Sequence, residues 1–223
     1  MTEIYPIRHA QTEGSRFPVH QGLRDDEQLQ VTLFSPAEDR AYYERCYADA
    51  WMFSHGDLRG FSAATYYTAA CRHHRQQPGS VLRIWLRGEP AGLVDLDPVR
   101  EAENKAGWVS LLYLEPAFRG KGHGIQLLER ADRFYRLQGR QSLRLLVAES
   151  NRTARAFYER EGFRRIGEEN GSTGKLLRLE RPIPAAGDPG GPGKNGVCVP
   201  MRRPVFHFVI KTLMQAEKYG KII

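Results

Sequence analysis

The chain has 223 residues, of which 41% are hydrophobic and 26% are charged. This length suits one α/β domain with added segments, and the apolar content is enough for a buried core, so global disorder is excluded. No run of about 18 apolar residues occurs, and the N-terminus lacks the basic and then apolar order of a signal peptide. These features predict a cytoplasmic protein without a membrane segment.

The cysteines and the net charge restrict the chemistry further. The three cysteines, Cys46, Cys71 and Cys198, are odd in number and far apart, which fits neither a disulfide framework nor a zinc site. We therefore expect free thiols and no bound metal. The 33 basic against 26 acidic residues give a net charge of +7, which favours an anionic partner. A nucleotide cofactor satisfies this preference as well as a nucleic acid does.

The first half of the chain begins with a polar segment, residues 1–30, that is interpreted as a leader of uncertain structure. A strand is predicted at residues 31–34. Ser35, Pro36 and Glu38 combine an N-cap, a proline at the first helical position and a capping box, so a helix is expected from there to about Trp51. A second helix and a hairpin of two strands are predicted at residues 62–75, 81–86 and 91–96.

The second half alternates buried strands with helices. Residues 107–114 form an almost continuous apolar run, which is typical of a central strand. The remaining patterns predict a helix at 125–137, a strand at 143–147, a helix at 153–161, and a hairpin of 164–168 and 175–180 around Asn170-Gly171. This order of elements predicts an α/β or α+β fold around one mixed sheet.

The C-terminal part differs in composition from the rest. Residues 182–196 are rich in glycine and proline, which indicates a linker after a folded domain at residues 31–181. The extension at residues 197–223 contains an apolar run at 205–210 and carries a positive net charge. An exposed apolar strand would aggregate, so we expect it to pair with an edge strand of its own domain or of a second subunit in a homodimer.

A glycine-rich segment lies between the predicted central strand and the following helix. Its glycines, Gly120, Gly122 and Gly124, allow close approach of the backbone to a ligand, and the first turn of a helix presents free N–H groups to an anion. A pyrophosphate group is the expected ligand. The alternative is a glycine-rich turn that binds nothing. The spacing differs from both the Walker pattern and the dinucleotide fingerprint.

Two segments carry a resemblance to a known family. Arg119-Gly120-Lys121-Gly122-His123-Gly124 resembles the Arg/Gln-x-x-Gly-x-Gly/Ala motif of the GNAT superfamily of acyl-CoA-dependent N-acyltransferases. The segment from Asn151 to Phe163 is similar to the Asn-x-x-Ala-x-x-x-Tyr-x-x-x-Gly-Phe segment of the same family. The resemblance is firm over residues 108–163 and extends to 31–181. It implies a mostly antiparallel, mixed central sheet with a splayed parallel strand pair and flanking helices.

The resemblance also implies roles for individual residues toward acetyl-CoA as co-substrate. The pyrophosphate would bind to backbone N–H groups of the glycine-rich segment, aided by the charges of Arg119 and Lys121. The pantetheine arm would lie between the strands at 109–114 and 143–147, against Leu112 and Leu114. A bulge near Leu112 would direct an N–H group at the thioester carbonyl. The implied cofactor-binding residues are Leu112, Leu114, Arg119, Gly120, Lys121, Gly122, His123, Gly124 and Asn151.

The resemblance implies one catalytic residue, Tyr158, which would protonate the departing thiolate. Each assignment has an alternative: Tyr158 has the helical spacing of a core aromatic residue, and Asn151 would serve equally as a helix cap. His73, His74 and His123 are interpreted as residues of solvated helix faces. Many relatives have a glutamate as general base where this chain has Ser110, and the replacement candidates are Asp95, Asp97, Glu115 or a water molecule.

These observations lead to an N-acyltransferase that moves an acetyl group to a primary amine of a small molecule or peptide by direct attack in a ternary complex. The alternative is an acyl-CoA-binding module without activity. A nucleic-acid-binding protein is disfavoured, because the positive charge is spread along the chain. The tyrosines and tryptophan within residues 37–75 would suit an apolar or cationic acceptor. A weaker resemblance, of Arg8-His9 to the first motif of histidine phosphatases, is interpreted as a remnant or coincidence.

Overall fold

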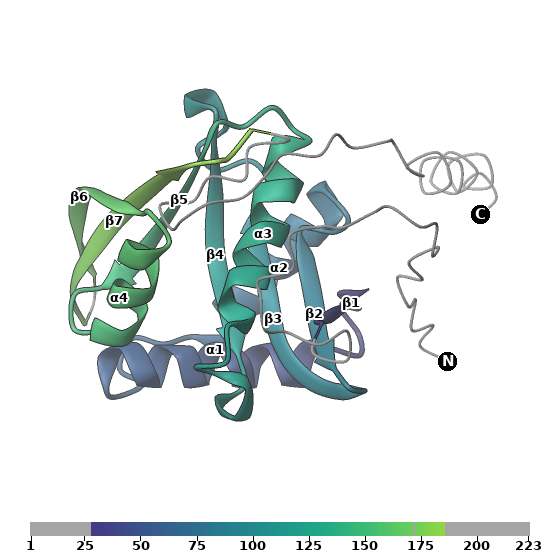
Figure 1. The fold of residues 1–223 in the computed structure, drawn as a ribbon. Coiled ribbons are helices and arrows are strands. Elements are labelled where there is room, and N and C mark those ends of the chain that lie inside the picture. Colours follow the sequence, from purple (N-terminus) through teal and green to yellow (C-terminus); the bar gives the residue numbers. More distant parts are fainter. Residues whose placement is uncertain (1–27, 172, 186–223) are drawn as a thin grey trace, which may run out of the picture.

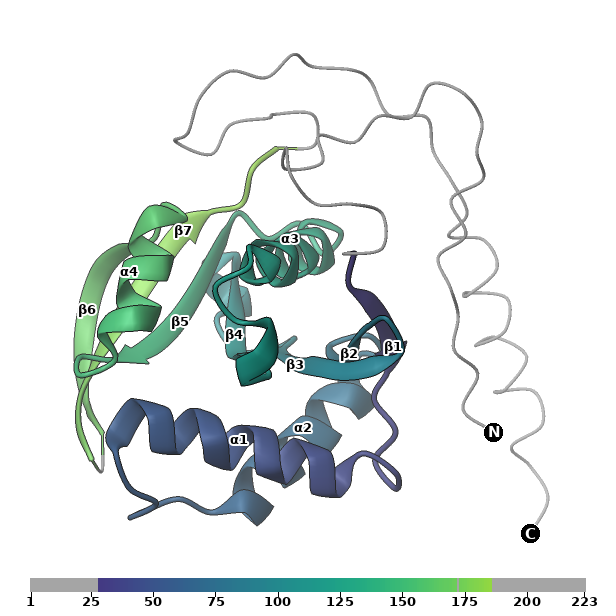
Figure 2. The same ribbon diagram turned by 60° about the horizontal axis from the view of Figure 1, so that its bottom comes forward.

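The computed structural model describes residues 28–185 except residue 172, and the leader, the Arg8-His9 motif and the C-terminal extension lie outside this part of the chain. In this described part, seven strands and four α-helices form three layers (Figures 1 and 2). The elements are β1 (Gln30–Leu33), α1 (Arg40–His55), α2 (Ala63–Gln76), β2 (Val81–Leu86), β3 (Glu89–Asp97), β4 (Ala106–Leu114), α3 (His123–Arg136), β5 (Ser142–Ala148), α4 (Arg152–Arg160), β6 (Arg164–Gly171) and β7 (Gly174–Pro182), with short 3₁₀ turns at Ala102–Asn104 and Pro116–Phe118.

The strands form one sheet in the order β1-β2-β3-β4-β5-β7-β6. All neighbouring strands are antiparallel except β4 and β5, which are parallel. This is the mixed sheet that the sequence predicted. A parallel pair needs a crossover connection, and α3 supplies it between β4 and β5.

Helices cover both faces of the sheet, as Figure 2 shows, with α1 and α2 on one face and α3 and α4 on the other. Side chains of β4 therefore alternate between two cores. Leu111 and Tyr113 pack with buried residues of α1 and α2, whereas Leu112 and Leu114 pack with the core under α3. A strand with both faces covered reads as a continuous apolar run, which explains the sequence of β4.

The helix expected to begin at Pro36 begins at Arg40 instead, which corrects the prediction. The N–H of Ser35 donates to the carboxylate of Asp39 at 2.7 Å, and the N–H of Asp39 donates to the Ser35 carbonyl at 2.8 Å. Asp39 also pairs with the buried guanidinium of Arg83. These bonds hold residues 35–39 in a turn. The N-cap predicted at Ser35 therefore lies four residues before the N-cap in the structure, which is Asp39.

The other predicted elements agree with the structure to within a few residues. Ser62 caps α2 by accepting a hydrogen bond from the Thr65 N–H, as its position before the alanine-rich segment predicts. The last hairpin turns after Gly171, slightly later than expected, because Gly171 still pairs with Gly174. Pro182 belongs to β7, and the next residue, Ile183, donates its N–H to the Gln141 carbonyl at 2.8 Å.

Candidate active site

The parallel strands β4 and β5 separate soon after they begin. Their pairing covers only Ala106, Gly107 and Trp108 on β4, opposite Ser142 to Arg144 on β5. Beyond this point β4 continues to Leu114, while β5 stays paired with β7 along its whole length to Ala148. The two strands therefore diverge toward their C-terminal ends, and the edge of β4 that faces β5 has no strand partner there.

The backbone of Leu112 and Leu114 faces this gap. The N–H of Glu115 donates to the Ala91 carbonyl at 2.9 Å, so Glu115 belongs to a hydrogen-bonded pair with β3. In an antiparallel ladder, hydrogen-bonded pairs occur at every second residue. The backbone N–H and C=O groups of Leu111 and Tyr113 therefore also point toward β3. The polar backbone groups of Leu112 and Leu114 consequently point the other way, toward the space between β4 and β5.

A β-bulge in β4 lies at Ser110 and not near Leu112, which corrects the prediction. Leu111 lies opposite Asp95, but the next residue of β3, Leu96, lies opposite Val109. Ser110 is the extra residue of β4 between these two pairs. Regular pairing from Leu114 down to Leu111 leaves no room for a bulge closer to Leu112. A bulge at this position turns the strand just past the last parallel pair.

The glycine-rich segment forms an open loop that leads into α3. Gly120 and Gly122 have φ angles of 74° and 83°, the left-handed region that favours glycine, and a β-carbon at either position would meet open space. Within the described residues, the N–H groups of Gly120, Lys121, Gly122 and Gly124 have no hydrogen-bond acceptor. The free donors and the helix dipole make this end of α3 suited to an anion.

Gly124 is constrained for another reason. A β-carbon there would lie 3.1 Å from the ring of Phe157 in α4. This glycine therefore allows α3 and α4 to pack closely, whether or not a ligand is bound.

The charged residues of the loop are placed differently from one another. Arg119 turns back onto the protein: its Nε donates to the Leu114 carbonyl at 2.8 Å, and its Nη2 lies 2.7 Å from Asp49 of α1. The side chain of Lys121 is exposed.

His123 is buried, with 3% of its surface exposed, so the expectation of a solvated histidine is wrong at this position. It is the first residue of α3.

Asn151 immediately precedes α4 and Tyr158 lies on it, and this helix flanks β5 (Figure 1). Asn151 caps the helix, because its Oδ1 accepts the Ala154 N–H at 3.0 Å, while its Nδ2 donates to Ser54 of α1 at 3.1 Å. Tyr158 is half-buried between the rings of Phe157 and Phe163. Its hydroxyl has no hydrogen-bond partner among the described residues. Burial raises the pKa of Tyr158 to about 12, so it stays protonated at neutral pH.

The three carboxylates considered as general bases are all engaged. Asp95 accepts hydrogen bonds from Tyr43 and contacts Nδ1 of His73, each at 2.7 Å, and Asp97 lies 3.1 Å from Nε2 of the same histidine. Glu115 is paired with Arg45. Burial acts to raise the pKa of Glu115, but hydrogen bonds from Arg45 and Tyr113 hold it below its ordinary value.

His73 was expected on a solvated helix face, and it is buried instead, with 3% of its surface exposed. Burial alone would lower the pKa of His73, but the hydrogen bond with Asp95 and the close carboxylate of Asp97 raise it to about 9. The histidine is thus a cation at neutral pH. The only sequence signal for this network is that Asp95 and Asp97, two apart on one strand, share a face. Their partner lies more than twenty residues away.

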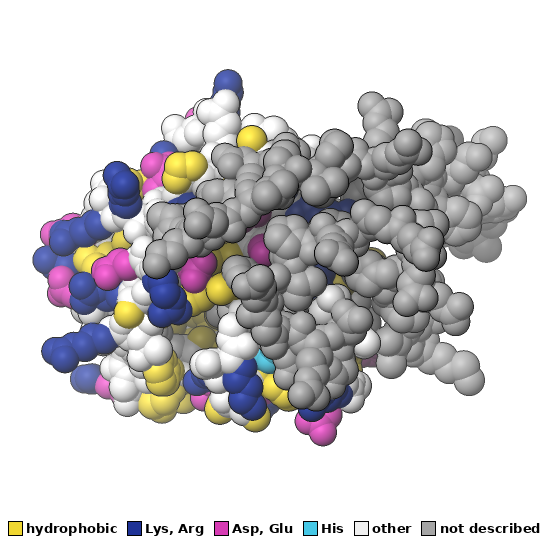
Figure 3. Space-filling model, viewed as in Figure 1, with side chains coloured by type: hydrophobic (Ala, Val, Ile, Leu, Met, Phe, Trp, Pro, Cys, Tyr) yellow, Lys and Arg dark blue, Asp and Glu magenta, His cyan; other side chains and the backbone are white. Residues whose placement is uncertain are grey.

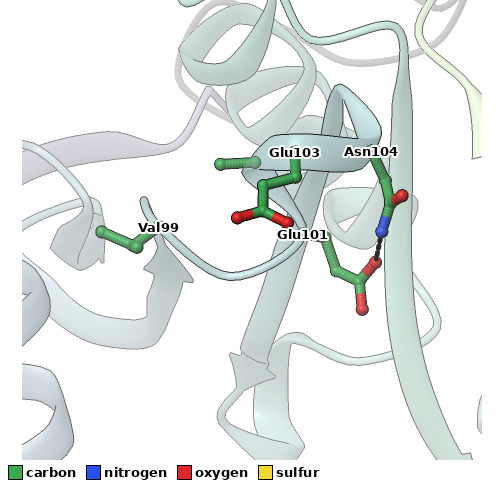
Figure 4. A pocket seen from close by; sticks show the side chains of 5 residues that line it. Val99, Glu101, Glu103 and Asn104 are labelled. Atoms are coloured by element: carbon green, nitrogen blue, oxygen red, sulfur yellow. Dashed lines mark hydrogen bonds between the residues drawn. The ribbon is translucent and has the colours of Figure 1, made fainter.

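A hollow lies elsewhere, in the connection from β3 to β4 (Figure 4). It is lined by Val99, Glu101, Ala102, Glu103 and Asn104, and Asn104 donates a hydrogen bond to Glu101 at 2.8 Å. This connection leads into the N-terminal end of β4, opposite to the glycine loop, and includes none of the motif residues. Within the described part of the chain, no group of three or more acidic, histidine or cysteine residues could hold a metal, and no helix could span a membrane.

The comparison with known families agrees with this architecture. Residues 36–163 match the family model described as "Acetyltransferase (GNAT) family". The match covers more than half of the chain, which therefore belongs to the GNAT acetyltransferase family and is an enzyme of that class. None of the curated proteins matches the sequence.

Solved structures share the fold at low sequence identity. Ard1 from Thermoplasma volcanium has 20% identity and a TM-score of 0.56, over 70% of this chain and 97% of its own. YncA from Salmonella typhimurium, solved with acetyl-CoA, has 18% identity and a TM-score of 0.55, over 74% and 99%. Spermidine N-acetyltransferase from Vibrio cholerae, solved with CoA and spermine, has 18% identity and a TM-score of 0.54, over 70% and 96%.

Proposed function

We propose that this enzyme transfers the acetyl group of acetyl-CoA to a primary amine by direct attack in a ternary complex. The observation that carries the proposal is the position of the β4–β5 gap. The gap opens after three residue pairs and lies beside the N–H groups at the start of α3 that have no acceptor among the described residues. A phosphate-bearing cofactor with a long flexible arm fits this combination. Structural neighbours bound to acetyl-CoA or CoA support the choice of cofactor.

In this proposal the pyrophosphate binds at residues 120–124, and the arm runs along β4. The N–H of Leu112, directed into the gap, donates to the thioester carbonyl and stabilises the negative charge that develops there. The residues held by other contacts have supporting roles. Arg119 positions the loop through Asp49, and Asn151 fixes the start of α4.

The amine nitrogen attacks the carbonyl carbon, the new C–N bond forms, and the C–S bond breaks. The departing sulfur receives the proton of Tyr158, and the proton released by the nitrogen replaces it, so CoA leaves as a thiol. A lysine-like amine must first lose a proton, which costs about 5 kcal/mol at neutral pH. Because the nearby carboxylates are paired, we assign this step to a water molecule at Ser110.

The experiment is to incubate the full chain with acetyl-CoA and a panel of primary amines, and to measure thiol release together with the mass of the product. Amine-dependent thiol release and an acetylated amine are expected. The alternative is a module that binds acyl-CoA without turnover. It is favoured by the pairing of Asp95, Asp97 and Glu115, because none of these candidate general bases is free to accept a proton. Calorimetric binding of acetyl-CoA with no amine-dependent thiol release would favour that alternative.

The face of the molecule drawn in Figure 3 gives no support to a nucleic-acid partner. Figure 3 shows basic and acidic side chains intermixed over the region of β6, β7 and α4, instead of a continuous basic stripe. We therefore keep the small-molecule or peptide amine as the acceptor. Cytoplasmic location, the division into leader, domain, linker and extension, and a homodimer remain predictions.

A further inference from the structure

An arginine lies over the last residue of β4 that pairs with β5. The guanidinium carbon of Arg100 is 3.4 Å from the centre of the Trp108 ring, a close cation–π contact. Trp108 is buried, with 3% of its surface exposed, whereas Arg100 is exposed. The backbone N–H of Arg100 donates to Asp97 at 3.0 Å, which fixes the turn that carries it. The arginine is therefore held at the point where the strands begin to separate.

Arg100 also lies near the bulge. Ser110 follows Trp108 by two residues, which is about 7 Å along a strand. The Tyr47 hydroxyl, on α1, donates to the Ser110 carbonyl at 3.4 Å. The positive charge of Arg100 acts on this same hydroxyl, although burial, the largest cause, keeps the pKa of Tyr47 above its ordinary value. Tyr47 thus joins α1 to the bulge at Ser110, two residues along β4 from the tryptophan on which Arg100 stacks.

The hydrogen-bonding state of Arg100 differs from that of the neighbouring arginines. Arg144 pairs with Glu101 and Glu180, and Arg178 pairs with Glu101 and Glu169. Among the described residues, the guanidinium of Arg100 has no hydrogen-bond acceptor.

The acidic groups whose charges reach Arg100 are Asp97, Glu101 and Glu169. All three are bonded elsewhere: Asp97 contacts His73, and the two glutamates contact Arg178. None of these carboxylates therefore occupies the planar donors of Arg100, which lie over Trp108, where β4 and β5 begin to separate.

We propose that Arg100 binds a carboxylate of the acceptor, so that the substrate is an amine that also carries a carboxylate a few bonds away, such as an amino acid. The inference rests on the proposed function. A guanidinium offers two parallel N–H donors to a carboxylate, and the ring of Trp108 holds its plane fixed. A polyamine would bring a second positive charge beside Arg100, which is unfavourable. In this proposal the amine of the bound acceptor lies toward the bulge at Ser110, two residues along β4 from Trp108.

The test compares amino acids with their carboxamides, which differ only in the charged group. The measured quantity is kcat/KM for the acid divided by kcat/KM for its amide. This ratio should be at least tenfold higher in the wild type than in the Arg100→Gln variant. Arg100→Lys should retain part of the preference. The intrinsic reactivity of the two amines cancels, because the same pair is compared between variants. Arg75→Gln, an exposed arginine of α2, is the matched control and should leave the ratio unchanged.

A binding measurement separates this inference from the proposed function. Calorimetry on the CoA-saturated full chain should show that an N-acetyl amino acid binds at least tenfold more tightly than its amide, and that Arg100→Gln removes the difference. If acetyl-CoA binds but no amine is acetylated, the proposed function fails while calorimetry still decides the carboxylate site. Equal use and equal binding of acid and amide by the wild type, or a preference that persists in Arg100→Gln, would overturn the inference.

Discussion

Arg119 and Asp49 form an ion pair of 2.7 Å that joins the glycine loop to α1. The same aspartate accepts a hydrogen bond from the Tyr113 hydroxyl at 2.9 Å, so the loop, β4 and α1 meet at one carboxylate. Five residues further along α1, Ser54 contacts Ser150 and Asn151 at the start of α4. Helix α1 is thereby attached to elements on both sides of the gap between β4 and β5.

This relationship gives the first prediction. If Arg119 acts by holding the loop through Asp49, Arg119→Gln and Asp49→Asn should weaken acetyl-CoA binding equally. Partly exposed ion pairs contribute about 0.2–1 kcal/mol, so each change should raise the dissociation constant by less than about fivefold. Calorimetry on both single variants and the double variant measures this. A double variant no weaker than either single variant is expected, and a much larger effect of Arg119→Gln alone would indicate direct contact with the cofactor.

The second prediction concerns Gly122. An alanine there has no clash but must adopt a φ of 83°, at a cost of about 1 kcal/mol, or rearrange the loop. We expect Gly122→Ala to weaken acetyl-CoA binding by about fivefold or more, because a rearranged loop misplaces its N–H donors. Gly139, at the other end of α3, has a φ of 73° and equally open surroundings. Gly139→Ala should therefore lose similar stability and retain binding. Equal affinities for the two variants would exclude the loop as the pyrophosphate site.

The third prediction concerns Tyr158. Its hydroxyl has no partner in the described part of the chain, so Tyr158→Phe should leave the melting temperature almost unchanged. Loss of a general acid should lower kcat by about 100-fold while the KM for acetyl-CoA stays similar. Steady-state kinetics at saturating substrates, with chemistry shown to limit the rate, provide the measurement. An unchanged kcat would assign Tyr158 to packing between Phe157 and Phe163.

The fourth prediction concerns pH. Because the pKa of His73 is raised from 6.5 to about 9 in the folded state, its contribution to stability is fully present below pH 6.5 and is lost as pH rises to 9. The free energy of unfolding should fall by about 3 kcal/mol over this range. Denaturant unfolding at several pH values checks this. The His73→Gln variant should be less stable at pH 6 and should lack the pH-dependent loss. A wild type equally stable at pH 6.5 and pH 9 would refute the assignment.

Much of the architecture follows from local sequence patterns. Apolar runs fixed the positions of β2 and β4, because strands buried on both faces need apolar residues throughout. Glycines at positive φ marked the loop before α3, since other residues rarely adopt that conformation. The order of the two motifs, which are separated by a helix and a strand, predicted the GNAT fold and its splayed pair.

Other features depend on contacts between segments far apart in the chain, and only the tertiary structure decided them. His73 became a buried cation because β3 places two aspartates against α2. Asp39 bonds to Ser35 and Arg83, which moved the start of α1 to Arg40. The register between β3 and β4 placed the bulge at Ser110. The stacking of Arg100 on Trp108 has no local pattern either, because burial and charge pairing arise only when the layers pack together.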